Sequence, residues 1–214
     1  MSAGRTVNSL RQDWRTPQNY ADAIAVYFGG KLSLDPCGAR NSFIRAKTHY
    51  ILPEHDGLRE TWSFPSIFVN PPYGADRERG TSIRDWLRRC ALANEEHGSE
   101  VIALVPIAAN TSHWKLYVWP KAKGIVFLYD TRLKFVVDGL QVDKGAPMAC
   151  SLIYWGDRQR MFLEHFREFG AAVPLDSVLL PDAARMPRSH RRMHVQGVLE
   201  YREVGRMHVS KSPS

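Results

Sequence analysis

Short apolar runs alternate with segments of helical periodicity over most of the chain. Apolar runs bounded by Pro, Gly or Asp are typical of strands that helices cover on both faces. Such runs predict strands at residues 32–37, 66–70, 101–106, 124–130 and 149–155. Strands that alternate with helices indicate an α/β domain, and we expect a mostly parallel central sheet flanked by helices.

The clearest helix signal covers residues 82–97. Its apolar residues recur at the i, i+3, i+4, i+7, i+8 spacing of one buried helix face. They are Ile83, Trp86, Leu87, Cys90 and Ala91. Thr81 or Ser82 can cap the beginning of this helix and Gly98 its end. Other patterns predict helices at residues 20–28, 112–119 and 160–169.

Two segments depart from this alternation. Residues 134–143 carry Asp138-Gly139 between two β-like runs, which predicts a hairpin that projects from the domain. After Pro181 the chain contains seven Lys or Arg residues against three Asp or Glu residues. We therefore expect a domain over residues 1–180 and a basic tail over residues 181–214. Such a tail is either solvated or an arm that lies on phosphates.

The composition fits one domain with a substantial core, because 44% of the 214 residues are hydrophobic. The formal net charge of +7 favours a polyanionic partner such as nucleic acid, although many basic proteins have no such partner. Cys37, Cys90 and Cys150 lack the paired spacing of a zinc or redox site, so we predict no metal. No stretch has the length of a signal-peptide core or a membrane span, so we expect a cytoplasmic protein without membrane association.

The run SIFVNPPYG, residues 66–74, ends a predicted buried strand in an amide, two prolines and an aromatic ring. Ligands of open α/β sheets bind beyond the carboxyl ends of the strands, which is where Asn70 falls. The Asn70 side-chain carbonyl and the Pro71 backbone carbonyl are two acceptors, and Pro72 restricts the second. Two acceptors at a fixed separation suit an –NH₂ group such as the adenine amine, with Tyr73 stacking on the base. The alternative is a rigid turn after a strand.

The adenine amine needs a strong alkyl donor, because its lone pair is delocalised into the ring. The sulfonium of S-adenosylmethionine meets that need. The segment Leu34-Asp35-Pro36-Cys37-Gly38 places a carboxylate at the end of the first predicted strand, suited to the donor's amino group or ribose. A turn or capping role for Asp35 is equally consistent with the sequence. A Gly-x-Gly-x-x-Gly run is absent there, which counts against NAD or FAD.

Six segments together resemble the phage-type, Dam-like DNA N-6-adenine methyltransferases over about residues 12–160. They are Asp13-Trp14-Arg15-Thr16-Pro17, Leu34-Asp35-Pro36-Cys37-Gly38, His55-Asp56-Gly57-Leu58 with Trp62, Phe68-Val69-Asn70-Pro71-Pro72-Tyr73-Gly74, Leu104-Val105-Pro106 and Arg132-Leu133-Lys134-Phe135. The resemblance implies a Rossmann-like, S-adenosylmethionine-dependent methyltransferase that acts on the N-6 amine of adenine in DNA. Proteins of this type commonly serve a phage or prophage, whose DNA the methylation would shield from restriction.

The resemblance also implies a role for individual residues. The catalytic motif is matched by Asn70, Pro71, Pro72 and Tyr73. Donor-binding positions are matched by Trp14, Thr16, Pro17, Asp35, Pro36 and Asp56. For Thr16 and its neighbours the alternative is a turn that begins a helix, and for Asp56 it is a loop residue that caps a turn.

Arg132, Lys134 and Phe135 would lie near DNA, with the rim of a surface hairpin as the alternative. The chain departs from the family pattern after Leu104-Val105-Pro106, because residues 107–111 lack the arginine we would expect.

Three other functions remain open. The same Asn-Pro-Pro-Tyr chemistry serves methyltransferases that modify RNA bases or a protein glutamine amide. The basic charge disfavours a protein substrate, and the wider set of motifs disfavours RNA. A catalytically silent α/β module that binds nucleic acid belongs to a different class, and donor binding in the absence of DNA would separate it from the enzymes.

Overall fold

A seven-stranded sheet forms the centre of the computed structural model, which describes residues 15–130, 136–137, 140–141 and 148–181. Its strands are β1 (Leu34–Asp35), β2 (Thr48–His49), β3 (Ser66–Val69), β4 (Glu100–Pro106), β5 (Gly124–Leu128), β8 (Cys150–Trp155) and β9 (Gly170–Pro174). The order across the sheet is β2-β1-β3-β4-β8-β5-β9. The five predicted strands are confirmed as β1, β3, β4, β5 and β8, whereas β2 and β9 were not predicted.

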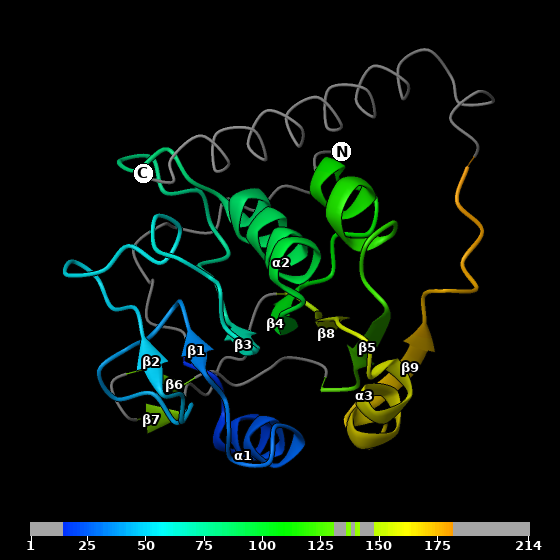
Figure 1. The fold of residues 1–214 in the computed structure, drawn as a ribbon, viewed down its shortest axis with the longest axis horizontal. Helices are drawn as coiled ribbons and strands as arrows, with labels where there is room; N and C mark the ends of the chain where they lie inside the picture. The colour runs from blue at the N-terminus through cyan, green and yellow to red at the C-terminus, as the bar shows by residue number, and fades with distance from the viewer. Residues whose placement is uncertain (1–14, 131–135, 138–139, 142–147, 182–214) are drawn as a thin grey trace, which may run out of the picture.

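Four helical segments pack on this sheet (Figure 1). They are α1 (Gln18–Tyr27), α2 (Ile83–His97), the π-helical turn η1 (Trp114–Val118) and α3 (Gln159–Phe166). Each lies where a helix was predicted, with ends that differ by a few residues. The mixed α/β class is therefore confirmed.

The sheet itself is mixed, and the prediction of a mostly parallel sheet is wrong. β2, β1, β3 and β4 pair in parallel. β8, however, lies between β4 and β5 and is antiparallel to both, and β9 is antiparallel to β5. Most of the aligned residues in the sheet belong to antiparallel pairs, so the sheet is mostly antiparallel. A strand buried on both faces, as β8 is, has the same apolar pattern in either direction.

Two hydrophobic clusters lie on opposite faces of the sheet. α2 and η1 cover one face, where Trp86, Leu87 and Trp114 are buried. α1 and α3 cover the other face, where Ile24 and Phe162 are buried. Figure 1 shows α2 above the sheet and α1 and α3 below it. The sheet is thus the middle layer of three.

The ends of α2 follow the residues that the sequence offered as caps. Ser82 is the N-cap, and its backbone N–H donates to Asp85 Oδ2 at 2.8 Å in a capping box. Gly98 ends the helix in the left-handed conformation, with a φ of 64°. Of the two predicted N-cap candidates, Ser82 is confirmed.

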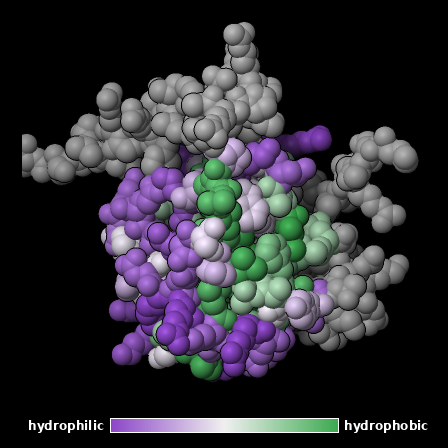
Figure 2. Space-filling view, turned by 90° about the vertical axis from the view of Figure 1, so that its right-hand side faces the viewer, coloured by the Kyte–Doolittle hydropathy of each residue, from purple (hydrophilic) through white to green (hydrophobic). Residues whose placement is uncertain are grey.

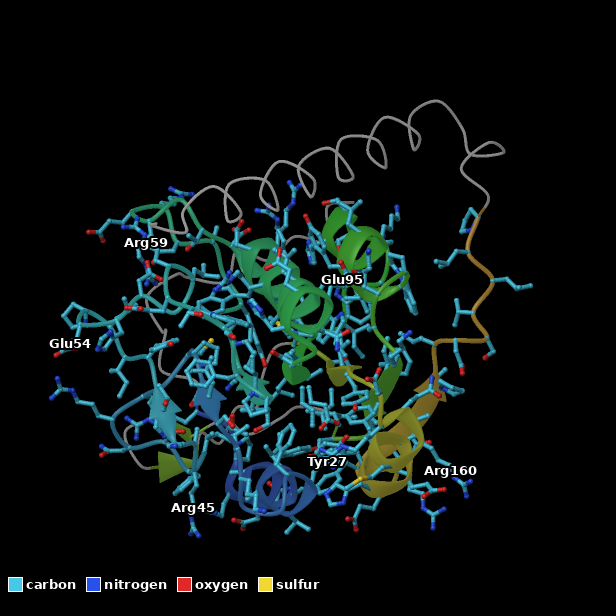
Figure 3. The ribbon with its side chains drawn as sticks, viewed as in Figure 1. Tyr27, Arg45, Glu54, Arg59, Glu95 and Arg160 are labelled. Carbon is cyan, nitrogen blue, oxygen red and sulfur yellow. The ribbon has the colours of Figure 1, made fainter. Side chains whose placement is uncertain are left out.

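The amino end of β4 is fixed by a polar cluster that joins it to α1, to β8 and to the start of α3. Glu100 Oε1 accepts hydrogen bonds from Tyr27 Oη at 2.9 Å, from Arg158 Nε at 2.9 Å and from Tyr154 Oη. Figure 3 shows Tyr27 between α1 and α3. Burial opposes ionisation of Glu100, but these hydrogen bonds outweigh it and lower the pKa of the carboxyl.

The predicted hairpin is present as two short strands. β6 (Val136–Val137) and β7 (Leu140–Gln141) pair with each other in antiparallel fashion. Asp138-Gly139 and the basic tail from residue 182 onward lie outside the described residues. In the described part of the chain, no helix combines the length and apolar character that crossing a bilayer requires.

The face that carries α3 and β9 shows a band of apolar residues between hydrophilic ones (Figure 2). Exposed apolar side chains in this part of the chain include Met161, Leu179 and Leu180. β1 and β3 lie toward the opposite edge of the sheet from β9 (Figure 1).

Candidate active site

A cavity of about 330 Å³ opens beyond the carboxyl ends of β1 and β3. These strands are parallel neighbours, so the residues that follow them meet at one edge of the sheet. Five predicted site residues line the cavity, and they come from three separate motifs: Thr16, Asp35, Pro36, Asn70 and Pro72. The volume lies within the range of roughly 300–1,000 Å³ that is usual for small-molecule sites.

Asn70 directly follows β3, so the strand fixes the position of its backbone. Its side-chain Nδ2 donates to Thr16 Oγ1 at 3.2 Å. Its backbone also lies close to the Cys37 thiol. Pro71 is buried next to it, and Pro72 contributes to the cavity wall. Asn70 is therefore held between the segment before α1 and the segment after β1.

Tyr73 is turned toward the core. Its hydroxyl donates to the backbone carbonyl of Leu104 in β4 at 3.3 Å, and its ring packs against the cluster on the α1 and α3 face. Burial raises the pKa of the Tyr73 phenol well above its usual value, and the nearby Cys150 adds to this effect. In the described part of the chain, Tyr73 does not line the cavity. Stacking of Tyr73 on a base stays a prediction.

Asp35 is buried at the end of β1, with 3% of its surface exposed. Its Oδ1 accepts a hydrogen bond from the Cys37 backbone N–H at 3.0 Å, and its Oδ2 lies 3.4 Å from His49 Nδ1 in the neighbouring β2. The contact with Asp35 raises the pKa of His49, against the opposing effect of burial. One carboxylate oxygen thus faces the backbone and the other faces a histidine.

The Cys37 thiol lies beside this carboxylate. Burial raises its pKa well above the ordinary value, and the Asp35 charge raises it further. A thiol of this kind stays protonated and is a poor nucleophile, so the chemistry of the site does not point to covalent catalysis by Cys37.

The loop that contains Gly57 closes one side of the cavity. A Cβ atom on Gly57 would lie 1.9 Å from the Pro36 carbonyl oxygen, so only glycine permits this approach. The buried Trp62 side chain donates from Nε1 to the Gly57 carbonyl at 2.7 Å. The hydrogen bond from Trp62 and the close contact with Pro36 therefore hold this loop against the end of β1.

Asp56 caps a turn in the same loop. Its Oδ1 accepts from the Leu58 backbone N–H at 3.1 Å, and its Oδ2 lies 3.5 Å from Arg59 Nε. Figure 3 shows Arg59 and Glu54 at the outer edge of the molecule on this side. Its neighbours His55 and Gly57 line the cavity, whereas Asp56 does not. A contact between Asp56 and the donor adenine stays a prediction.

Three arginines that line the cavity were not predicted as site residues: Arg15, Arg40 and Arg79. Arg79 lines it from the loop after the Asn70 motif, and Arg79 Nε forms an ion pair with Asp76 Oδ2 at 2.7 Å. Asp76 Oδ1 also accepts from the Arg79 backbone N–H at 3.0 Å. Arg15 lines the cavity from the segment before α1. Asp76 lies three residues before Arg79, and Gly80 follows it. This local turn signal could have identified Arg79.

The remaining predicted residues lie elsewhere. Pro17 is the N-cap of α1, and its carbonyl accepts from the Tyr20 backbone N–H at 3.1 Å. The other predicted positions fall outside the described residues: Trp14, Arg132, Lys134 and Phe135. In the ranges that the structure describes, no cluster of His, Cys, Asp or Glu residues could hold a metal ion.

The chain is an α/β protein with a cavity of small-molecule size beside an Asn-Pro-Pro-Tyr motif. The model of the DNA N-6-adenine-methyltransferase (Dam) family matches residues 3–170 of the chain. The match covers well over half of the sequence, so the chain belongs to this family, as its motifs predicted. Comparisons with curated proteins and with solved structures gave no match.

Proposed function

We propose that this protein is a site-specific DNA methyltransferase that transfers a methyl group from S-adenosylmethionine to the N-6 amine of adenine. One observation carries the proposal: Asn70 at the end of β3 and Asp35 at the end of β1 line the same cavity. Membership of the Dam family supports adenine in DNA as the acceptor.

The chemistry of the cavity fits the donor. S-adenosylmethionine, when bound, supplies a methyl group on a sulfonium sulfur. The buried Asp35 carboxylate would face its ammonium group or its ribose hydroxyls, since a buried carboxylate favours a cationic or hydrogen-bonding partner. Arg15 and Arg79 line the same cavity and would complement the donor carboxylate. Apolar surface from Phe68 and Trp86 completes the wall.

The acceptor side depends on Asn70 and Pro71. Their carbonyl oxygens would accept the two N–H bonds of the adenine amine and draw the nitrogen toward tetrahedral geometry, which frees its lone pair for attack on the methyl carbon. The new N–C bond forms as the S–C bond breaks, its electron pair stays on sulfur, and the surplus proton on nitrogen is lost to water. The protein contributes position and electrostatic stabilisation, without a general base of shifted pKa.

DNA contacts would come from the excess of basic residues, which gives the chain a net charge of +7, and from the hairpin of β6 and β7. A target adenine must leave the duplex to reach Asn70, and Tyr73 would then hold the extruded base. Phosphate contacts from Lys and Arg would position the duplex, and a few side chains would read bases.

The test is transfer of tritium from methyl-labelled S-adenosylmethionine to unmethylated plasmid DNA, with total RNA and total protein as parallel acceptors. Nucleoside analysis should find the label in N-6-methyladenine from DNA. Label confined to RNA or to protein would keep the amine chemistry and overturn the substrate. Donor binding without transfer to any acceptor would contradict the assigned reaction, and absence of donor binding would favour a silent nucleic-acid-binding module.

A further inference from the structure

We propose that Thr16 is a positioning residue that sets the orientation of the Asn70 side-chain amide. This inference rests on the proposed function, because it concerns the acceptor that Asn70 presents to the target amine. The Thr16 hydroxyl accepts a hydrogen bond from Asn70 Nδ2 at 3.2 Å, between residues 54 positions apart in the chain. The family resemblance assigned Thr16 to the donor instead.

The orientation of this amide decides whether Asn70 can accept a hydrogen bond from the target amine. An Asn side chain has a donor end, the NH₂ group, and an acceptor end, the carbonyl oxygen. The adenine amine offers N–H bonds, so only the acceptor end of Asn70 can receive one. In the structure Nδ2 faces Thr16, so the carbonyl end of Asn70 points away from Thr16. An amide turned by half a turn would place its carbonyl against the Thr16 hydroxyl and would present a donor to the donor groups of the target amine. The bond to Thr16 therefore holds the Asn70 amide in the orientation seen in the structure, which is the productive one.

Thr16 is itself fixed by its surroundings. Only 3% of its surface is exposed, and the next residue, Pro17, is the N-cap of α1. α1 is anchored one turn later, where Tyr20 Oη donates to Asp130 Oδ2 at 2.6 Å. A hydroxyl held in this way can orient a partner side chain, because it does not adjust to follow that partner.

The two possible roles of Thr16 predict different kinetics. A donor-binding residue changes the dissociation constant of S-adenosylmethionine and leaves the rate at saturating donor nearly intact. A residue that orients Asn70 lowers the rate at saturation and leaves donor affinity nearly intact, because its effect is confined to the acceptor side.

The experiment compares wild type with Thr16→Val, which removes the hydroxyl at similar size, and with Thr16→Ser, which restores it. Thr61→Val is the matched control, since Thr61 is exposed and its Oγ1 accepts only from the Ser63 backbone N–H at 3.3 Å among the described residues. Donor affinity is measured by calorimetry with S-adenosylmethionine alone. Single-turnover methylation of unmethylated plasmid DNA is measured at saturating donor.

Thr16→Val should lower the single-turnover rate roughly 5- to 100-fold and leave the dissociation constant within about twofold of wild type. Thr16→Ser should recover most of the rate, and Thr61→Val should match wild type. A weaker donor affinity with an unchanged saturated rate would overturn the inference and return Thr16 to the donor site. Unchanged rate and affinity would overturn it as well.

Folding is checked by thermal unfolding of each variant, and Thr16→Ala serves as a second variant that removes the hydroxyl without adding a methyl group. If both Val and Ala lose the folding transition, Thr16 is a structural residue and the inference is wrong. If wild type itself transfers no methyl group to DNA, the proposed function fails, and that result is distinct from failure of the Thr16 role.

Discussion

Replacement of Gly57 by Ala is expected to disturb the donor site. In the structure a Cβ atom at this position would lie 1.9 Å from the Pro36 carbonyl oxygen, and contacts shorter than 3.0 Å essentially never occur for real Cβ atoms. The Gly57 loop and the end of β1 would have to separate by about 1 Å. That separation acts directly on Pro36 and on the adjacent Asp35, which both line the cavity.

The magnitude follows from two contacts. Forced overpacking costs about 1–3 kcal/mol, and loss of the hydrogen bond from the buried Trp62 indole to the Gly57 carbonyl costs about 1–3 kcal/mol more if no water replaces it. A loop movement that breaks the hydrogen bond also relieves part of the overpacking, so the two costs do not add in full. We expect a total destabilisation near 2–3 kcal/mol. For a domain of this size that is a fall of roughly 4–12 °C in the melting temperature. A 1 Å displacement of the cavity wall should also weaken donor binding about tenfold or more.

Thermal unfolding and calorimetry with S-adenosylmethionine measure both effects. Gly74→Ala is the matched control, because nothing lies within 4 Å of a Cβ atom there. It should melt within about 1 °C of wild type. A Gly57→Ala variant with wild-type melting temperature and donor affinity would refute the view that this loop is pressed against the end of β1 to form the donor site.

Three further predictions concern ionisation and the acceptor side. Tyr73→Ala should weaken capture of DNA by roughly 1–3 kcal/mol in KM measurements if the ring holds the extruded base, and Tyr73→Phe should lose less; equal kinetics for Tyr73→Ala and wild type would make the ring structural. Glu100→Gln removes a carboxylate whose pKa is lowered by its hydrogen bonds, so the stability it contributes is present above about pH 4.5 and lost as the pH falls further. Melting curves at about pH 7 and about pH 3.5 should therefore show a smaller difference from wild type at the lower pH. His49→Gln has the opposite sign, since contact with Asp35 raises the pKa of His49 above 6.5: the wild-type advantage is complete below that pH and disappears as the pH rises through the raised value. Melting curves at about pH 6 and about pH 9 test it, and an equal difference at both would contradict the role of the charge.

The local patterns of the sequence were sufficient to locate most of the elements. The long apolar runs became β3, β4, β5 and β8, and the periodicity of residues 82–97 became α2. β2 has only two residues, too few for an alternating pattern to be visible. The direction of β8 was not predictable because its six residues are all buried, and a fully apolar run is compatible with parallel or antiparallel pairing.

The candidate site was predictable where a motif ends a strand. Asp35 ends β1 and Asn70 follows β3, and because these strands are parallel neighbours the meeting of the two residues follows from the rule for open α/β sheets. The bond between Asn70 and Thr16 joins two segments far apart in sequence, and no local pattern encodes it. The same is true of the contact of Gly57 with Pro36, in which the absence of a side chain is the essential feature. The inward position of Tyr73 depends on Leu104, a residue of a different strand.

The most direct test of the account is the N-6-methyladenine content of plasmid DNA, measured by nucleoside mass spectrometry after expression in a host that lacks adenine methylation. Wild type should introduce N-6-methyladenine, and Asn70→Ala should introduce essentially none while it binds S-adenosylmethionine with nearly unchanged affinity in calorimetry. An Asn70→Ala variant that methylates DNA at the wild-type rate would contradict the amine-holding mechanism. DNA without N-6-methyladenine after expression of correctly folded wild type would contradict the proposed reaction itself.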